Sequence, residues 1–189
     1  MKVIFLDNDG VICLSSNWGT RAKKRKLFLS KNPEFSKDIK KLPVIHRFDN
    51  FDKKAVSILN EIISETDCEI VVSSDWKLHA TLEELQEYYE SQGIIKKPIA
   101  TTPKMEEFDP ETNGLYMWKG FLEAKRIVEI KKFITEHPEI THWVSVDDLD
   151  MSNSTKNRNL GLDNFVLTPR MNEGIKQSGI KDKILKFLI

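Results

Sequence analysis

Two aspartates separated by one residue follow a short apolar run near the start of the chain, in the sequence Asp7-Asn8-Asp9-Gly10. Carboxylates this close repel each other unless a cation or a shared proton compensates their charge. Mg²⁺ would compensate it, because this ion favours a few carboxylates together with water and phosphate oxygens. Gly10 lets the backbone turn sharply here. The alternative is an aspartate-rich turn in which Asp9 only caps a neighbouring segment.

A second polar group, Ser73-Ser74-Asp75, follows the apolar run Ile70–Val72. A serine hydroxyl and the adjoining amides at a strand-to-helix turn can hold a phosphate oxygen. Serine and aspartate are also ordinary helix caps, so this group by itself leaves both readings open.

A third polar group contains Asp147, Asp148 and Asp150, and it follows the apolar run Trp143–Val146. Carboxylates at the tip of an apolar strand are costly to bury unless they are paired or bound to a metal. The alternative is a solvated loop, and it applies most directly to Asp150.

Short apolar runs precede all three polar groups and recur once more near the end of the chain. They predict buried strands at Val3–Leu6, Ile70–Val72, Trp143–Val146 and Phe165–Leu167. These runs are rich in Val, Ile and Phe, and they are continuous rather than alternating. Continuous apolar strands are typical of a parallel sheet that is covered by helices on both faces.

Amphipathic patterns predict helices over residues 51–65, 77–92, 121–136 and 173–188. We expect Asp49 or Asn50 to cap the first of them, and Leu78 and Leu122 to face the core. Strands alternating with helices predict an α/β fold with a Rossmann-like, doubly wound parallel sheet. Ligands of such sheets bind beyond the carboxyl ends of the strands, so the three polar groups should converge on one crevice.

The composition is that of a globular protein, with 189 residues, 40% apolar and 31% charged. This length predicts a single domain over residues 1–189. The formal net charge is zero and no apolar run approaches a membrane span, so we expect no membrane partner. The start does not resemble a signal peptide, and Cys13 and Cys68 make no disulfide framework, which favours a cytoplasmic protein. The oligomeric state is unknown.

The three polar groups, taken together, resemble a known family. DNDGV, VVSS and VSVDD are similar to motifs one, two and four of the haloacid dehalogenase (HAD) superfamily of phosphohydrolases, in the same order. IVVSSDWK, TP, RIVEI and HWVSVDD resemble one branch more closely, the HAD domain of Swiss Army knife RNA-repair proteins. The resemblance covers most of the chain apart from residues 14–50. It implies a HAD-like core in which that segment is a small, cap-like insertion after the first strand.

The resemblance implies a role for each residue of the motifs. Asp7 would attack phosphorus and become a phospho-aspartate, and Asp9 would act as general acid and base. Mg²⁺ would be held by Asp7, the backbone carbonyl of Asp9 and Asp147, with Asp148 supporting the metal. The hydroxyl of Ser73, with Ser74 beside it, would bind a phosphoryl oxygen.

The family also requires a cation, motif three, before the second pair of aspartates. Lys125 and Arg126 are the candidates, with Lys119 weaker, and RIVEI favours Arg126 as the phosphate-binding cation. Two features depart from the family pattern. Val11 stands where Thr is commoner, and Asp150 follows Asp148 sooner than the usual further acidic residue.

Residues 21–41 carry many Lys and Arg residues and few acidic ones. A basic cap could steer a nucleotide or nucleic acid into the site, or the lysines could form a solvated helix face. Trp18 and Trp76 could stack on a base, or belong to the core. The long segment 103–120 predicts a functional loop.

The sequence thus predicts a Mg²⁺-dependent phosphomonoesterase with a phospho-aspartate intermediate, acting on a nucleotide or polynucleotide phosphate end. Three alternatives remain: a phosphatase of small metabolites such as sugar phosphates or nucleotides, a module that binds a phosphate end without hydrolysis, and a phosphomutase.

Overall fold

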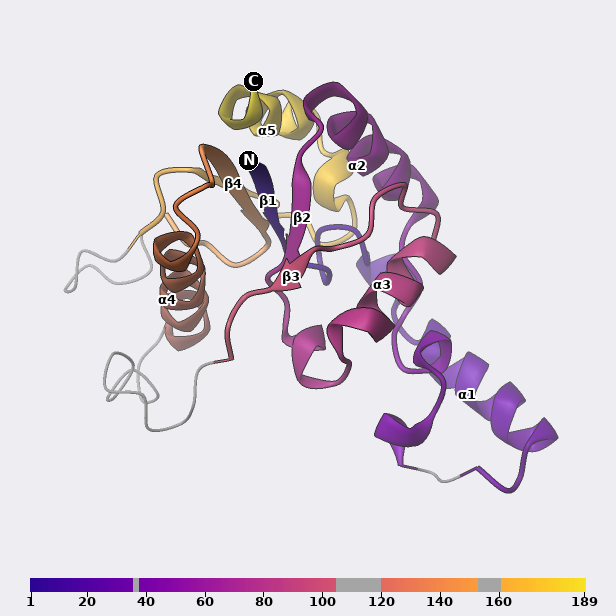
Figure 1. The fold of residues 1–189 in the computed structure, drawn as a ribbon. Coiled ribbons are helices and arrows are strands. Elements are labelled where there is room, and N and C mark those ends of the chain that lie inside the picture. Colours follow the sequence, from indigo (N-terminus) through magenta and orange to yellow (C-terminus); the bar gives the residue numbers. More distant parts are fainter. Residues whose placement is uncertain (36–37, 105–119, 153–160) are drawn as a thin grey trace.

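The computed structural model describes residues 1–35, 38–104, 120–152 and 161–189 (Figure 1). Most of the long segment 103–120, including the candidate cation Lys119, lies outside the described residues. So does Lys37 of the basic segment.

Five parallel strands form one sheet in the order β3-β2-β1-β4-β5. They are β1 (Lys2–Leu6), β2 (Glu69–Val72), β3 (Ala100–Thr101), β4 (His142–Asp147) and β5 (Phe165–Leu167). Strand β1 lies at the centre, between β2 and β4. The chain adds β2 and β3 on one side of β1 and then β4 and β5 on the other side. This arrangement confirms the predicted Rossmann-like α/β fold. The two-residue β3 escaped prediction because it has no apolar run of its own.

Helices cover both faces of the sheet, as continuous apolar strands require. Alternate residues of β1 point to opposite sides: Ile4 and Leu6 join one core cluster, and Val3 and Phe5 join another. The first cluster lies under α2 (Lys53–Thr66), α3 (Leu82–Ser91) and α5 (Ile180–Leu188), and the second lies under α4 (Phe121–Glu136). Figure 1 shows α4 across the sheet from α2.

The predicted helix over 121–136 agrees with α4, and the one over 51–65 agrees with α2 within two residues, but the other two helix predictions need correction. Residues 77–92 do not form one helix: a 3₁₀ turn at Asp75–Leu78 precedes α3, which begins at a capping box between Thr81 and Glu84. The segment 173–188 is likewise divided into a 3₁₀ turn and α5. No helix in the described ranges is long and apolar enough to cross a membrane.

Two core predictions and the predicted cap of the first helix also differ from the structure. Leu78 and Leu122 do not face the core, because they are 40% and 50% exposed. Asp52, rather than Asp49 or Asn50, caps α2 by accepting hydrogen bonds from the amides of the first turn. The pattern could not separate these candidates, because each precedes the same apolar stripe.

Asp49 instead anchors the insertion after β1. This segment contains α1 (Thr20–Lys31), none of whose side chains is buried. The carboxylate of Asp49 accepts a hydrogen bond from the Arg21 amide at 2.7 Å and from the Thr20 hydroxyl at 3.2 Å. Asp49 therefore satisfies the amino end of α1 from 28 residues away in the chain. A polar helix is held against the domain in this way, on the side where the strands end (Figure 1).

Candidate active site

The three polar groups lie side by side at the carboxyl edge of the central strands. The register pairs Leu6 with Val72 on one side and with Val146 on the other. Asp7 and Ser73 directly follow β1 and β2, and Asp147 is the last residue of β4. The Asp7 amide donates to the Val146 carbonyl at 3.1 Å, and the Ser73 amide donates to the Leu6 carbonyl at 2.9 Å. The site thus sits where ligands of doubly wound sheets bind.

The guanidinium of Arg126 bridges two of these carboxylates. Its Nη1 lies 2.9 Å from Oδ1 of Asp7 and 2.8 Å from Oδ2 of Asp147. These two carboxylates raise the pKa of Arg126 further, so this cation stays charged. The side chain is only 10% exposed, and α4 places it across the sheet edge from β1.

Lys125, the neighbouring candidate, takes a different position. Its Nζ lies 3.7 Å from the exposed carboxylate of Asp75, at the edge of the site. Adjacent residues on a helix point in different directions, so only one of the two cations could reach Asp7. Geometry places Arg126 there and Lys125 at the rim.

Asp7, Asp147 and Asp148 form a cluster whose carboxylate oxygens lie within 4.8 Å of one another. Burial raises the pKa of Asp7 well above its ordinary value, although the charge of Arg126 opposes this effect. Burial and the nearby Asp147 raise the pKa of Asp148 to about 6. One guanidinium does not neutralise three carboxylates. A set of hard oxygen donors with surplus negative charge fits Mg²⁺. A side-chain carbon at Gly10 would overlap the Asp148 carboxyl group, so the glycine makes room for the cluster.

Asp9 is not part of this cluster. Its Oδ2 accepts a hydrogen bond from Nε1 of Trp76 at 2.8 Å. The Asp9 carboxylate thus has a buried tryptophan as its partner, whereas the three carboxylates of the cluster could together hold a metal ion. A backbone carbonyl contribution from Asp9 stays a prediction.

Trp76 is not available to stack on a base. Its ring stacks on Phe48 with centroids 4.2 Å apart, lies against Phe51, and is 6% exposed. Stacking that covers the ring also fixes the direction of its N–H toward Asp9. Trp18, the other candidate, is 48% exposed.

Ser73 has a buried hydroxyl that donates to and accepts from nothing in the described part of the chain. Buried polar atoms almost always have a partner, because leaving one unpaired costs about 1–3 kcal/mol. Ser73 lies beside Asp7 at the sheet edge, so a phosphate oxygen placed there could provide the partner. Ser74 is buried next to it at the start of the 3₁₀ turn.

Asp150 lies apart from the carboxylate cluster. It is exposed, and its carboxylate accepts from the amide and the hydroxyl of Ser152. This is the solvated-loop arrangement that the sequence left open for Asp150.

A buried ion pair that the sequence interpretation missed joins Lys77 to Glu129. The side chains are 1% and 2% exposed, and Lys77 Nζ also donates to the Thr102 hydroxyl at 2.7 Å. Glu129 lies three residues after Arg126, so both point from the same face of α4 toward the sheet. The spacing within RIVEI was the available signal. The pair ties the loop after β2 to the helix that carries Arg126.

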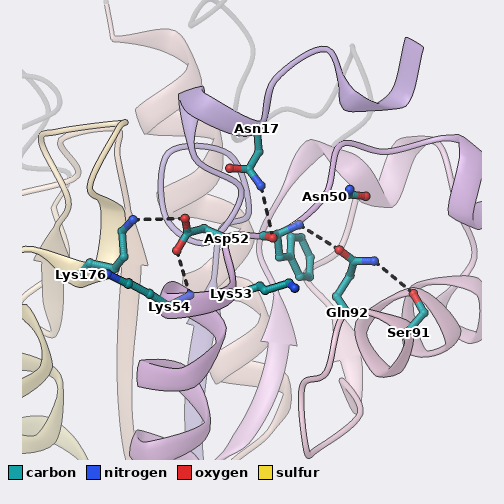
Figure 2. A pocket seen from close by; sticks show the side chains of 9 residues that line it. Asn17, Asn50, Asp52, Lys53, Lys54, Ser91, Gln92 and Lys176 are labelled. Atoms are coloured by element: carbon teal, nitrogen blue, oxygen red, sulfur yellow. Dashed lines mark hydrogen bonds and ion pairs between the residues drawn. The ribbon is translucent and has the colours of Figure 1, made fainter. Parts of the chain in front are cut away.

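A separate cavity of about 680 Å³ lies at the start of α2, away from these residues (Figure 2). Its polar side chains bind one another or nearby backbone: Lys176 lies 3.2 Å from Asp52, and Gln92 accepts from the Phe51 amide at 3.0 Å. None of the predicted site residues lines it. We assign no site there.

A family model described as the HAD domain in Swiss Army Knife RNA repair proteins matches residues 3–178. The matched range includes Asp7, Asp9, Ser73, Arg126 and Asp147. Comparisons with curated proteins and with solved structures returned no match.

The buried pair between Lys77 and Glu129 predicts strongly coupled effects on stability. Glu129→Leu leaves a buried ammonium without its carboxylate and should lower the free energy of unfolding by roughly 3–5 kcal/mol. Lys77→Met removes the cation that lies against the buried carboxylate of Glu129 and should also lower the free energy of unfolding. The double variant should recover most of the loss, as measured by urea denaturation. Additive losses in the double variant would contradict a direct, desolvated pair.

Proposed function

This chain belongs to the family of HAD domains in Swiss Army Knife RNA repair proteins, and on that premise we propose that it is a Mg²⁺-dependent phosphomonoesterase with a phospho-aspartate intermediate. The family suggests phosphohydrolase activity. The observation that carries the finer proposal is the guanidinium of Arg126 held between Asp7 and Asp147, next to the unpaired hydroxyl of Ser73.

Asp7 is suited to attack phosphorus. Burial raises the pKa of Asp7, and the guanidinium of Arg126 opposes this effect and pairs with the ionised carboxylate, which is the nucleophilic form. The same guanidinium and the hydroxyl of Ser73 can bind the phosphoryl oxygens, whose charge must be compensated as the new bond forms. The carboxylate oxygen of Asp7 forms the bond to phosphorus as the bond to the leaving alcohol breaks.

Asp9 is suited to transfer the proton. Protonated Asp9 gives its proton to the leaving alkoxide, and its carboxylate then takes a proton from the water that hydrolyses the phospho-aspartate. The hydrogen bond from Trp76 fixes the position of one oxygen, Oδ2, and we expect it to hold the carboxyl group in the orientation that proton transfer requires. A module that only binds phosphate has no need of an oriented proton donor, which favours the enzyme.

The carboxylates of Asp7, Asp147 and Asp148 would hold Mg²⁺. Bound there, the ion would neutralise charge on the nucleophile and the phosphate. The amide of Leu149 donates to Oδ1 of Asp147 at 2.9 Å, which fixes that carboxylate in place.

We further propose that residues 14–50 act as a small cap over this single domain, and that the substrate is a nucleotide or polynucleotide phosphate end. The amino end of α1 is anchored by Asp49, and α1 lies on the side where the strands end (Figure 1). Arg21 and Arg25 of this helix line a cavity with Asp9. A phosphatase of small metabolites would use the same catalytic residues.

Asp7→Asn should lower the rate of phosphate release by at least roughly 10³-fold, because an amide does not form the acyl phosphate. Release of inorganic phosphate from an aryl phosphate and from phosphorylated oligonucleotides would measure this in Mg²⁺. Asp150→Asn is the matched control, since it makes the same chemical change on an exposed carboxylate outside the cluster. Wild-type turnover by Asp7→Asn would disprove the covalent mechanism.

Trp76→Phe should lower kcat about tenfold for an alkyl phosphate, because it removes the hydrogen bond to Asp9 while keeping an aromatic ring against Phe48. An aryl phosphate with a good leaving group needs little help from a general acid and should be affected less. Trp143→Phe, on the opposite face of the sheet, is the control. Equal losses on both substrates would indicate a purely structural role.

Mg²⁺ should stabilise the protein more at pH 8 than at pH 5. Burial and the neighbouring Asp147 raise the pKa of Asp148 from its ordinary 3.8 to about 6, so without metal the folded state holds more protons than the unfolded state between these pH values. Stability from this group is therefore greatest at low pH and is lost as the pH rises through about 6. Mg²⁺ requires the ionised carboxylates and offsets that loss.

Thermal unfolding with and without Mg²⁺ at the two pH values would test this expectation. At a hundredfold excess over Kd, the ion should add about 2.7 kcal/mol at pH 8, or roughly 5–10 °C in Tm. Asp148→Asn should flatten the pH dependence. An equal shift at both pH values would place the ion elsewhere.

A further inference from the structure

A cavity of about 310 Å³ adjoins Asp9 on the side of the insertion. Its lining comprises Asp9, Arg21, Arg25, Arg47, Phe48, Asp75, Trp76 and His79. In the proposed function Asp9 protonates the leaving alcohol, so the leaving part of the substrate must lie on the Asp9 side of the scissile phosphate. The cavity is therefore the space available to the leaving group.

Arg47 lines this cavity, but its charge is already paired with a carboxylate. Its guanidinium makes two hydrogen bonds of 2.7 Å to the carboxylate of Glu84 and a third of 2.7 Å to the Leu42 carbonyl. It is 8% exposed. The paired charge and the complete set of partners assign Arg47 a structural role.

Hydrogen bonds also fix the position of Arg25, but its partners carry no negative charge. Its Nε donates to the His46 carbonyl at 2.9 Å and its Nη2 donates to the Arg47 carbonyl at 2.7 Å. Both partners are neutral. Within residues 1–35, 38–104, 120–152 and 161–189, no carboxylate lies within ion-pair distance of Arg25, and its Nη1 has no acceptor. A pre-positioned guanidinium with a free edge is suited to a phosphate oxygen.

Arg21 adds a second cation at the mouth. Its side chain is 53% exposed, and its Nε lies 3.5 Å from Oδ2 of Asp49. The other oxygen of the Asp49 carboxylate accepts a hydrogen bond from the Arg21 amide at the amino end of α1, so Asp49 compensates the Arg21 side chain only in part. Arg21 can therefore supplement Arg25 at the end of the cavity that the insertion forms.

The walls near Asp9 are apolar. Phe48 and Trp76 are 3% and 6% exposed and stack on each other. The volume is at the lower end of that of ligand pockets. The cavity thus brings together Asp9, two aromatic side chains, the exposed carboxylate of Asp75 and the guanidinium of Arg25, whose hydrogen-bond partners are neutral.

We propose that this cavity is a subsite for a second phosphate group, so that the substrate is a phosphomonoester whose leaving alcohol itself carries a phosphate or phosphodiester. The inference rests on the proposed function, and it narrows the substrate class. A nucleoside bisphosphate and the phosphorylated end of an oligonucleotide share this chemistry. A nucleoside monophosphate or an aryl phosphate lacks it.

The test compares kcat/KM for matched substrates that differ only in the second phosphate. Adenosine 3′,5′-bisphosphate is set against adenosine 3′-monophosphate and 5′-monophosphate, and a 3′- or 5′-phosphorylated trinucleotide forms the polymer arm. For the wild type, the second phosphate should raise kcat/KM at least tenfold, mainly through KM. The arm with the larger gain identifies the source of the second phosphate.

Variants of α1 locate the effect. The preference is the ratio of kcat/KM with the second phosphate to kcat/KM without it. Arg25→Gln should reduce this ratio to near one, and Arg21→Gln should reduce it about threefold. Lys23→Gln is the matched control, because Lys23 is an exposed cation of the same helix outside the cavity lining and should keep the wild-type preference. If Arg25→Gln does not fold, two other variants test the subsite. Arg21→Gln, at an exposed position, should still lower the preference, and Arg25→Lys should keep most of it because the charge is conserved.

The outcomes separate the two proposals. A wild-type preference near one, together with turnover that Asp7→Asn abolishes, would overturn the subsite and leave the phosphomonoesterase intact. An equal loss of preference in Lys23→Gln would also overturn it, by showing a general charge effect. If no substrate is turned over, calorimetric binding of the bisphosphate and the monophosphates decides: equal affinities overturn the subsite, and a preference lost in Arg25→Gln supports it without hydrolysis.

Discussion

The charge on one buried guanidinium, that of Arg126, determines how the rest of the site can be arranged. Asp7 and Asp147 end at the same edge of the sheet because β1 and β4 are neighbours in register. Two buried carboxylates at that distance would destabilise the fold without a cation between them. Arg126 must therefore reach across from α4, and the position of α4 over the sheet becomes part of the site. The buried pair of Lys77 and Glu129 holds the same helix face to the loop after β2.

The insertion after β1 completes the site from the other side. It brings Phe48 against Trp76, and Trp76 directs its N–H to Asp9, so the side chain proposed to transfer protons depends on a segment outside the sheet. The same insertion presents Arg25 with its charge unpaired in the described chain and lines a cavity with it. Orientation of Asp9 and recognition of the leaving group thus arise from one packing arrangement, which links catalysis to substrate choice.

Much of the fold could be predicted because its signals are local. Four of the five strands are continuous apolar runs, and the polar residues that follow them mark the carboxyl edge. The predictions failed where tertiary contacts override local preference. Asp49 precedes an apolar stripe, as a helix cap does, yet it binds the amino end of α1 instead. Trp76 could have been an exposed stacking residue, but Phe48 and Phe51 cover it.

By itself the sequence determined four of the five strands, the order of the motifs and the three strand tips that meet, because apolar continuity and residue types are properties of short segments. Tertiary structure decided which cation faces Asp7, since Lys125 and Arg126 differ only in the direction in which α4 presents them. It also decided that Glu129 pairs with Lys77 and that Arg25 is left with neutral partners. Such pairings join residues far apart in the chain, and their energies depend on burial, which no single segment specifies.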